Sequence, residues 1–324
     1  MRRAFTIGLV TLLFDCRAPE GAIRLGIAAQ QSSTQILPYL ADELDYYFEE
    51  GLSVRLEEFS GSGKAVEALI GGGLDVVSGY HEQVLALPPG APKLVSFLAM
   101  TNGHMVALAV APRSKARPKV RSVAHLKGKT VGVTSLGSAT HLWLNHLLRR
   151  NGMEPQDVNP VAISTAGRAV AALERNIVEA GVVSDFTVRT LEKRFGNVLI
   201  LADSRTAESA RAVYGVDQYP GAVLFARAEW LERNESTARR LVKVIERTRQ
   251  WVRSHKPEEI SARLPASHRG EDGALHVEVT RGVTAMLSPD GLISHEGAAA
   301  AARLAGANND GKGSYTNAYV SGGH

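Results

Sequence analysis

The amino-acid sequence predicts an α/β protein built from two similar lobes, and three observations support this prediction. A motif occurs twice, as SGSGKAVEALIGGGLDVVS at residues 60–78 and as STAGRAVAALERNIVEAGVVS at residues 164–184. The length of 324 residues is typical of about two domains. Short apolar runs alternate with helical patterns, as in parallel β-α-β units. Two copies are too few for a solenoid, and chance recurrence of small residues is the alternative explanation.

The beginning of the chain resembles an export signal. Two arginines precede an uncharged run at residues 4–14, which has the length of a signal h-region and is too short to cross a bilayer. We therefore expect residues 1–21 to be a signal peptide and the protein to be periplasmic or otherwise extracytoplasmic. Cys16 offers a lipid anchor, although Asp15 stands where a lipoprotein box has a small residue; cleavage after Ala18 and an ordinary buried strand are the other options.

The first part of the chain predicts most of one lobe. An apolar run at residues 23–29 predicts a strand, and apolar side chains at helical spacing from Leu37 to Phe48 predict one helix that Gly51 ends. Around the first copy of the repeated motif, residues 54–59 and 74–78 predict two further strands.

The second lobe is predicted to have the same kind of elements. Residues 126–133 predict its main strand, which leads through the polar loop at 134–140 into a helix. The second copy of the motif follows. An apolar run at 222–226 and a long helix at 229–255 then return the chain to the first lobe.

This element order predicts a hinge made of two crossings between the lobes. We place the crossings near residues 101–105 and 218–224. The first lobe is then discontinuous and comprises residues 22–104 and 221–324, whereas the second lobe comprises residues 105–220.

Three loops rich in Ser and Gly precede predicted helices, at residues 60–63, 135–138 and 164–167. Helix N-termini expose unpaired N–H groups and carry partial positive charge, so they favour anions. Lys64 and Arg168 occupy matching positions in the two repeats and would add positive charge. Each loop alone is also explained as an ordinary capped turn, but together they indicate an anion-binding cleft between the lobes.

Motifs for catalysis, metal binding and nucleotide hydrolysis are missing from the sequence. GSGKA at residues 61–65 has Ala65 where a phosphate-binding loop needs Ser or Thr. His141 and His146 are five residues apart and lie on different helix faces, and the single cysteine excludes an internal disulfide. The net charge of +4 is mild for this length. We therefore expect a monomeric protein that is not an enzyme, with no metal, no cofactor and no nucleic-acid partner.

Several segments together resemble the substrate-binding proteins of bacterial ABC importers for nitrate, aliphatic sulfonates and taurine, a group that includes thiamine-pyrimidine binders. The block LKGKTVGVTSLGSATHLWLNHLLRRNGMEPQDV at residues 126–158 carries the resemblance most specifically, and weaker matches occur at residues 40–56, 63–79, 169–185 and 288–304. The resemblance implies a two-lobe type II periplasmic-binding-protein fold with a double-crossover hinge. It also implies capture of a small, anionic ligand by closure of the lobes and delivery to a membrane permease.

The family's ligand contacts come from loops at strand ends. The corresponding positions here, to which the residue analysis adds Arg168, are Gln31, Ser32, Ser62, Lys64, Tyr80, His81, Thr101, Ser135, Ser138, Thr140, Thr165 and Asp185. If the two cations point into solvent instead, Tyr80, His81 and Asp185 would recognise a neutral or cationic heterocycle. A pyrimidine-forming enzyme on the same scaffold and a ligand-sensing subunit are the functional alternatives.

Overall fold

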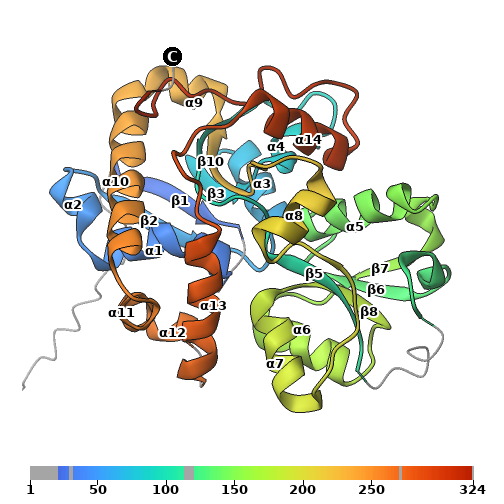
Figure 1. Cartoon of the computed structure of the whole chain (residues 1–324). Helices are drawn as coiled ribbons and strands as arrows, with labels where there is room; N and C mark the ends of the chain where they lie inside the picture. Colours follow the sequence, from blue (N-terminus) through green and yellow to red (C-terminus); the bar gives the residue numbers. More distant parts are fainter. Residues whose placement is uncertain (1–20, 29–31, 113–119, 270–271, 323–324) are drawn as a thin grey trace, which may run out of the picture.

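The computed structural model describes residues 21–28, 32–112, 120–269 and 272–322, so residues 1–20 of the expected signal peptide lie outside the described residues. Two five-stranded sheets, each covered by helices, form two lobes side by side (Figure 1). The fold class predicted from the sequence, two α/β lobes, is therefore confirmed. Within the described part of the chain, no helix is both long enough and apolar enough to cross a membrane.

The first sheet belongs to lobe 1. Its central strands are buried except at one arginine in each of β1 and β10, and their apolar side chains pack against helices on both faces. β1 is parallel to β2 and β3, whereas β10, which arrives from the far end of the chain, is antiparallel to β3 and β4. In spatial order, the strands are β2 (Val54–Glu58), β1 (Ile23–Ile27), β3 (Val76–Tyr80), β10 (Ala222–Arg227) and β4 (Leu94–Ala99).

The second sheet, in lobe 2, repeats this arrangement. β6 is parallel to β7 and β8, and β5 is antiparallel to β8 and β9. In spatial order, the strands are β7 (Asn159–Ala162), β6 (Thr130–Val133), β8 (Ala180–Ser184), β5 (Val106–Val110) and β9 (Ile200–Asp203). In each sheet the antiparallel fourth strand is the one that crosses from the other part of the chain. The repeated sequence motif thus reflects a repeated lobe.

Helices cover the faces of both sheets. Those of lobe 1 are η1 (Ser33–Gln35), α1 (Ile36–Glu43), α2 (Tyr46–Glu49), α3 (Ser62–Ile70), α4 (Glu82–Leu85), α9 (Ala228–Arg233), α10 (Glu235–Ser254), α11 (Pro257–Arg263), α12 (Ala266–Arg269), α13 (Gly273–Ala285) and α14 (His295–Ala305). Those of lobe 2 are η2 (Val123–Leu126), α5 (Ala139–Arg150), η3 (Pro155–Asp157), α6 (Ala166–Glu174), α7 (Asp185–Phe195) and α8 (Ala207–Tyr214).

The helix predicted from Leu37 to Phe48 is interrupted in the structure. α1 ends at Glu43, and Asp45 adopts a left-handed backbone with a φ of 59° before α2 begins. The break rotates the second half, so that Tyr47 is buried and Phe48 is 83% exposed. The prediction of one continuous apolar stripe was therefore wrong at its end.

The two lobes are joined where the chain crosses twice. The first crossing connects β4 to β5, and the second precedes β10; Asn102 pairs with Pro220 between them. Thr101 Oγ1 donates a hydrogen bond to the carbonyl of Gly103 (3.0 Å) and accepts one from the Ala222 N–H (2.9 Å). A Cβ on Gly221 would lie 2.7 Å from the Gly103 nitrogen, so this approach of the two crossings requires glycine.

Candidate functional site

A cavity lies between the two lobes, next to the first crossing. Both lobes supply its walls, and the polar side chains among them are mostly hydroxyls. The residues that line it are Ser32, Ser33, Ser62, Tyr80, His104, Met105, Val106, Thr134, Ala139, Thr140, Ser164, Thr165, Ala166, Ala169, Val183, Ser184, Phe186 and Thr187.

The lobe 1 wall is organised by a cluster of hydroxyl groups at the ends of β1 and β3. Thr34 Oγ1 lies 2.8 Å from Tyr80 OH and 3.0 Å from Ser32 Oγ. Burial raises the pKa of Tyr80, so its phenol stays protonated and can donate a hydrogen bond. The cluster therefore fixes Ser32 and Tyr80 at the cavity.

The lobe 2 wall contains a matching hydroxyl cluster between β6 and α5. Thr134 Oγ1 lies 3.0 Å from Thr140 Oγ1, and both lie 2.9 Å from Ser138 Oγ. Ser138 is fully buried and also caps α5 by accepting a hydrogen bond from the N–H of His141 (3.4 Å). Ser138 itself does not line the cavity. Its hydrogen bonds orient Thr134 and Thr140, which do.

Four helices begin at the cavity, so several helix N-termini converge on one cleft. Ser62 stands at the start of α3, Ala139 at the start of α5 and Ala166 at the start of α6, while α7 contributes Phe186 and Thr187. Ser62 Oγ also accepts a hydrogen bond from the N–H of Ala139 (3.1 Å), which joins the two lobes at the rim. The partial positive charge of these helix N-termini gives the cleft a positive potential, and no charged side chain belongs to the described lining.

A buried polar network stands behind the cavity at the hinge. His104 Nε2 lies 2.7 Å from Glu82 Oε1 in lobe 1, and His104 Nδ1 lies 2.6 Å from the hydroxyl of Tyr214 in lobe 2. Tyr219 OH donates to the other Glu82 oxygen (3.1 Å). Burial and the Glu82 carboxylate raise the pKa of Tyr219 well above its usual value, so it remains a donor. His104, in the first crossing, thus contacts side chains of both lobes, and Tyr219 of the second crossing joins the same network through Glu82.

Strained backbone is concentrated around the cavity. Among the described residues other than glycine, five have a positive φ, and three of these line the cavity: Met105 (54°), Ser164 (62°) and Ala166 (47°). Such conformations cost about 1–3 kcal/mol each and persist where surrounding structure enforces them. They place the loop before α6 and the first crossing against the cleft.

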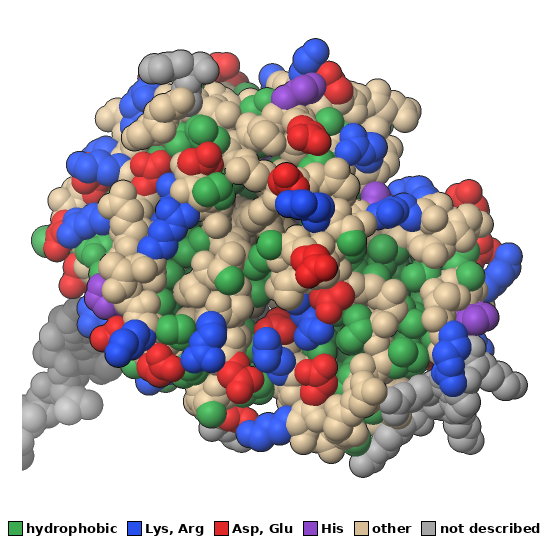
Figure 2. All heavy atoms as spheres, in the orientation of Figure 1, with side chains coloured by type: hydrophobic (Ala, Val, Ile, Leu, Met, Phe, Trp, Pro, Cys, Tyr) green, Lys and Arg blue, Asp and Glu red, His purple; other side chains and the backbone are tan. Residues whose placement is uncertain are grey.

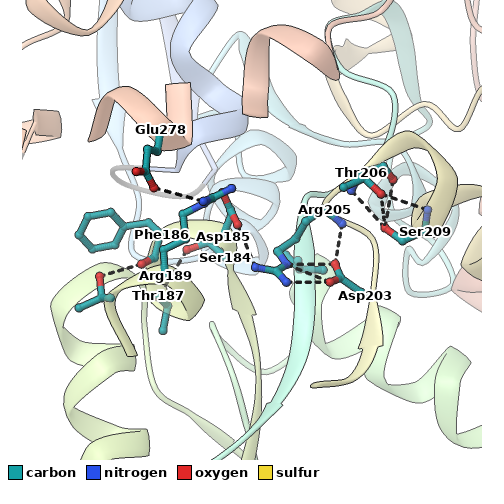
Figure 3. A network of polar contacts seen from close by, with 12 residues as sticks. Ser184, Asp185, Phe186, Thr187, Arg189, Asp203, Arg205, Thr206, Ser209 and Glu278 are labelled. Carbon is teal, nitrogen blue, oxygen red and sulfur yellow. Dashed lines mark hydrogen bonds and ion pairs between the residues drawn. The ribbon is translucent and has the colours of Figure 1, made fainter. Parts of the chain in front are cut away.

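Asp185 lies beside the cavity but is turned away from it. Its carboxylate is buried and accepts from Arg189 Nε (2.7 Å) and from Arg205 Nη1 (3.1 Å), so that it sits between two guanidinium groups (Figure 3). Arg205 also binds Asp203, and Arg189 reaches Glu278 on α13 of lobe 1 (3.3 Å). Asp185 is therefore part of a charge network that joins α7, the end of β9 and α13.

The structure brings five of the predicted site residues together at the cavity. These are Ser32, Ser62, Tyr80, Thr140 and Thr165. Gln31 lies outside the described residues.

Four other predicted residues are buried or packed elsewhere and have structural roles. His81 is fully buried, with Nδ1 at 2.8 Å from Ser96 Oγ and Nε2 at 3.2 Å from Ser314 Oγ, and so holds the C-terminal segment against β4. Thr101 is part of the hinge, Ser138 caps α5 and Asp185 belongs to the charge network. In this structure these four residues support the site and are not part of the cavity lining.

The remaining three predicted residues also lie outside the cavity lining. Lys64 and Arg168 are exposed on α3 and α6, and no residue of the described lining is Lys, Arg, Asp or Glu. Ser135 faces Gly61 across the gap between the lobes, and its buried Oγ has no hydrogen-bond partner among the described residues. On the face seen in Figure 2, basic and acidic side chains are interspersed.

Sequence reasoning missed the hinge network and the apolar part of the lining. The network residues do not form a sequence motif, because they come from elements far apart in the chain: Glu82, Tyr214 and Tyr219. His104 could have been noticed, since it stands in the predicted first crossing, where a polar side chain faces both lobes. Phe186 follows directly after a predicted strand end and could have been considered on the same ground.

Comparisons with known proteins agree with this architecture. Residues 17–266 match the model of the NMT1-like family. The Bacillus subtilis (strain 168) protein named "putative binding protein YtlA" is 24% identical over 268 residues, which is 79% of this chain and 75% of YtlA.

Solved structures extend the comparison to the fold. A protein from Bordetella bronchiseptica RB50 has a TM-score of 0.85 at 28% identity, covering 92% of this chain and 95% of that one. The periplasmic aliphatic sulphonate binding protein SsuA from Escherichia coli has a TM-score of 0.64 at 23% identity, covering 88% and 90% of the two chains.

Proposed function

We propose that this chain, which belongs to the NMT1-like family and shares the fold of periplasmic binding proteins, captures a small anion for import by an ABC transporter. Relatives that carry the name of binding proteins support a binding role rather than an enzymatic one, and the similarity to a periplasmic protein supports an extracytoplasmic location. The ligand classes we propose are alkanesulfonates, taurine and nitrate. A sulfonate is favoured by the similarity to SsuA, a protein that binds aliphatic sulphonates.

One observation carries the proposal: helix N-termini and hydroxyl groups from both lobes line a single cleft. An anion in this cleft would receive N–H and O–H donors from α3 in lobe 1 and from α5 and α6 in lobe 2. Hydrogen bonds to charged groups are worth about 1.5–3 kcal/mol each, and a helix N-terminus adds roughly 0.3–2 kcal/mol. A ligand that bridges both lobes favours the closed state, which is the basis of capture by hinge closure.

Lys64 and Arg168 do not supply the charge in this proposal, because both point into solvent outside the lining. Neutral dipoles can replace the water around an oxyanion, since they are oriented before the ligand arrives. The anion would therefore be held without a salt bridge, which makes its binding less sensitive to salt than pairing with a surface cation.

A neutral heterocycle is the second candidate. It is favoured by the uncharged described lining and by the aromatic side chains of Tyr80 and Phe186. Of the three residues predicted to recognise such a ligand, Tyr80 lines the cavity, whereas His81 and Asp185 are engaged elsewhere. A cationic heterocycle would lack a carboxylate partner in that lining.

Delivery to a membrane permease remains part of the proposal, as do a monomeric state and a lipid anchor at Cys16. A sensor subunit would use the same cleft and closure. Genes for a permease and an ATPase next to this one would support the importer, and a neighbouring receptor gene would support the sensor.

Thermal-shift screening tests the proposed function. The panel should contain alkanesulfonates, taurine, nitrate, aromatic carboxylates and pyrimidines. We expect at least one anion to raise Tm in a concentration-dependent manner, because a ligand that binds only the folded protein stabilises it. A shift with pyrimidines alone would favour the second candidate, and a full panel without a shift would count against transport of these classes.

A further inference from the structure

We propose that the cleft selects a monoanion whose organic part is uncharged, and that it discriminates against zwitterions. This inference rests on the proposed function and narrows its ligand class. An aminoalkanesulfonate such as taurine carries an ammonium group that needs a carboxylate or several strong acceptors once it leaves water. Whether taurine can bind therefore depends on whether a carboxylate near the cavity is free to pair with its ammonium group.

The carboxylates nearest to the cavity already have partners. Glu82 is bound by His104 at 2.7 Å and by Tyr219 at 3.1 Å, and it lies behind the histidine ring. Asp185 is bound by Arg189 at 2.7 Å and by Arg205 at 3.1 Å. Neither carboxylate is part of the lining, so an ammonium group would have to displace a buried partner to reach one.

The other acidic groups of the same network are also occupied. Asp203 holds Arg205, with the closest pair of atoms at 2.8 Å, and Glu278 holds Arg189 at 3.3 Å (Figure 3). The three undescribed residues that precede Ser32 are Ala-Gln-Gln and carry no charge. Each of the three carboxylates in this network thus holds a guanidinium partner, and none of them lines the cavity.

Part of the cavity lining is apolar and suits an uncharged organic group. Met105, Val106, Ala169 and Val183 are buried there, and Phe186 adds an aromatic ring from the first turn of α7. The hydroxyls and the starts of α3, α5 and α6 lie among the other lining residues. A ligand with one anionic end and one apolar end matches both parts, whereas an ammonium group on the second end would lose its water against hydrocarbon.

Three ligands of nearly equal size isolate the effect of this second charge. Propane-1-sulfonate, isethionate and taurine share a sulfonate on a two-carbon chain that ends in CH₃, OH or NH₃⁺. Isothermal titration calorimetry of the mature protein with each gives three dissociation constants. We expect taurine to bind at least tenfold more weakly than either of the other two.

A matched pair of variants tests whether the missing carboxylate is the cause. Phe186→Glu places an acid at the second residue of α7, where an acid is also compatible with the helix dipole. Phe186→Gln makes nearly the same change in shape without the charge. We expect Phe186→Glu to raise the affinity for taurine relative to isethionate at least tenfold over the wild-type ratio, and Phe186→Gln to leave that ratio unchanged.

The outcomes separate the inference from the proposed function. If taurine binds the wild-type protein as tightly as isethionate, the inference is overturned while anion capture stands. If none of the three sulfonates binds, the proposed capture of sulfonates fails and the inference fails with it. The wild-type series decides this even if Phe186→Glu does not fold.

Discussion

Gly61 in lobe 1 lies against Ser135 in lobe 2, and we expect closure of the cleft to require this contact. A Cβ at position 61 would lie 2.9 Å from Ser135 Cβ and closer still to its Oγ, which real Cβ atoms do not tolerate. The φ of Gly61 is −179°, so alanine fits the backbone and only the approach of the other lobe forbids it. Gly61→Ala should therefore penalise the closed state specifically.

The expected magnitude follows from the overlap. Overpacking by one methyl group typically costs about 1–3 kcal/mol, and a penalty of that size on the binding-competent state raises Kd by roughly 5- to 150-fold. Calorimetry with the ligand found by screening measures the change. Gly167→Ala is the control, because it adds the same methyl group at the start of the helix of the second repeat, where its Cβ would meet open space. Wild-type affinity in Gly61→Ala would refute the role of this contact in closure.

Three further predictions follow from the same geometry. Burial lowers the pKa of His81 to about 3, so between about pH 6.5 and 3 the unfolded state binds the proton and the folded state does not. The free energy of unfolding should then fall with decreasing pH by up to about 1.4 kcal/mol per pH unit from this residue, and denaturant titrations of wild type and His81→Gln at pH 7 and 4.5 should show a smaller loss in the variant. Lys64→Ala and Arg168→Ala should each change ligand affinity less than twofold, because both side chains are exposed outside the lining; a tenfold loss in calorimetry would restore them as ligand contacts. Asp185→Asn should lower the free energy of unfolding by about 2–3 kcal/mol, since it leaves two guanidinium groups short of a buried partner, and a denaturation midpoint equal to wild type would contradict this.

Much of the fold could be predicted from the sequence because its determinants are local. The repeated motif of loop, helix and strand marks α3–β3 and α6–β8, and these units occupy the same place in two sheets of identical strand order. The break between α1 and α2 was missed because Leu44 and Phe48 keep helical spacing. The left-handed Asp45 that rotates the chain carries no strong signal in the sequence.

The predicted site residues and the cavity lining differ because lining a cavity depends on the direction of each side chain. Lys64 follows the lining residue Ser62 by two positions, which places it about 200° around the helix and away from the cleft. Arg168 stands in the same relation to Ala166, whereas Ala169, three positions after Ala166, does line the cavity. Helical periodicity alone could therefore have excluded both cations.

The hydrogen-bond and ion-pair partners of Asp185 and His104 could not be predicted from helical periodicity. Asp185 is paired with Arg205 from the loop after β9, and His104 with Glu82 from α4 and Tyr214 from α8. These contacts join elements that are distant in the sequence, and they form only when both crossings are in place.

A crystal structure of the mature protein with 2-bromoethanesulfonate tests the central claim most directly, because the anomalous signal of bromine marks one end of the ligand and the sulfonate the other. We predict the sulfonate at the starts of α3, α5 and α6, among Ser62, Thr140 and Thr165, with bromine toward Phe186. A sulfonate paired with Lys64 or Arg168, or bound outside the cleft between the lobes, would contradict the account.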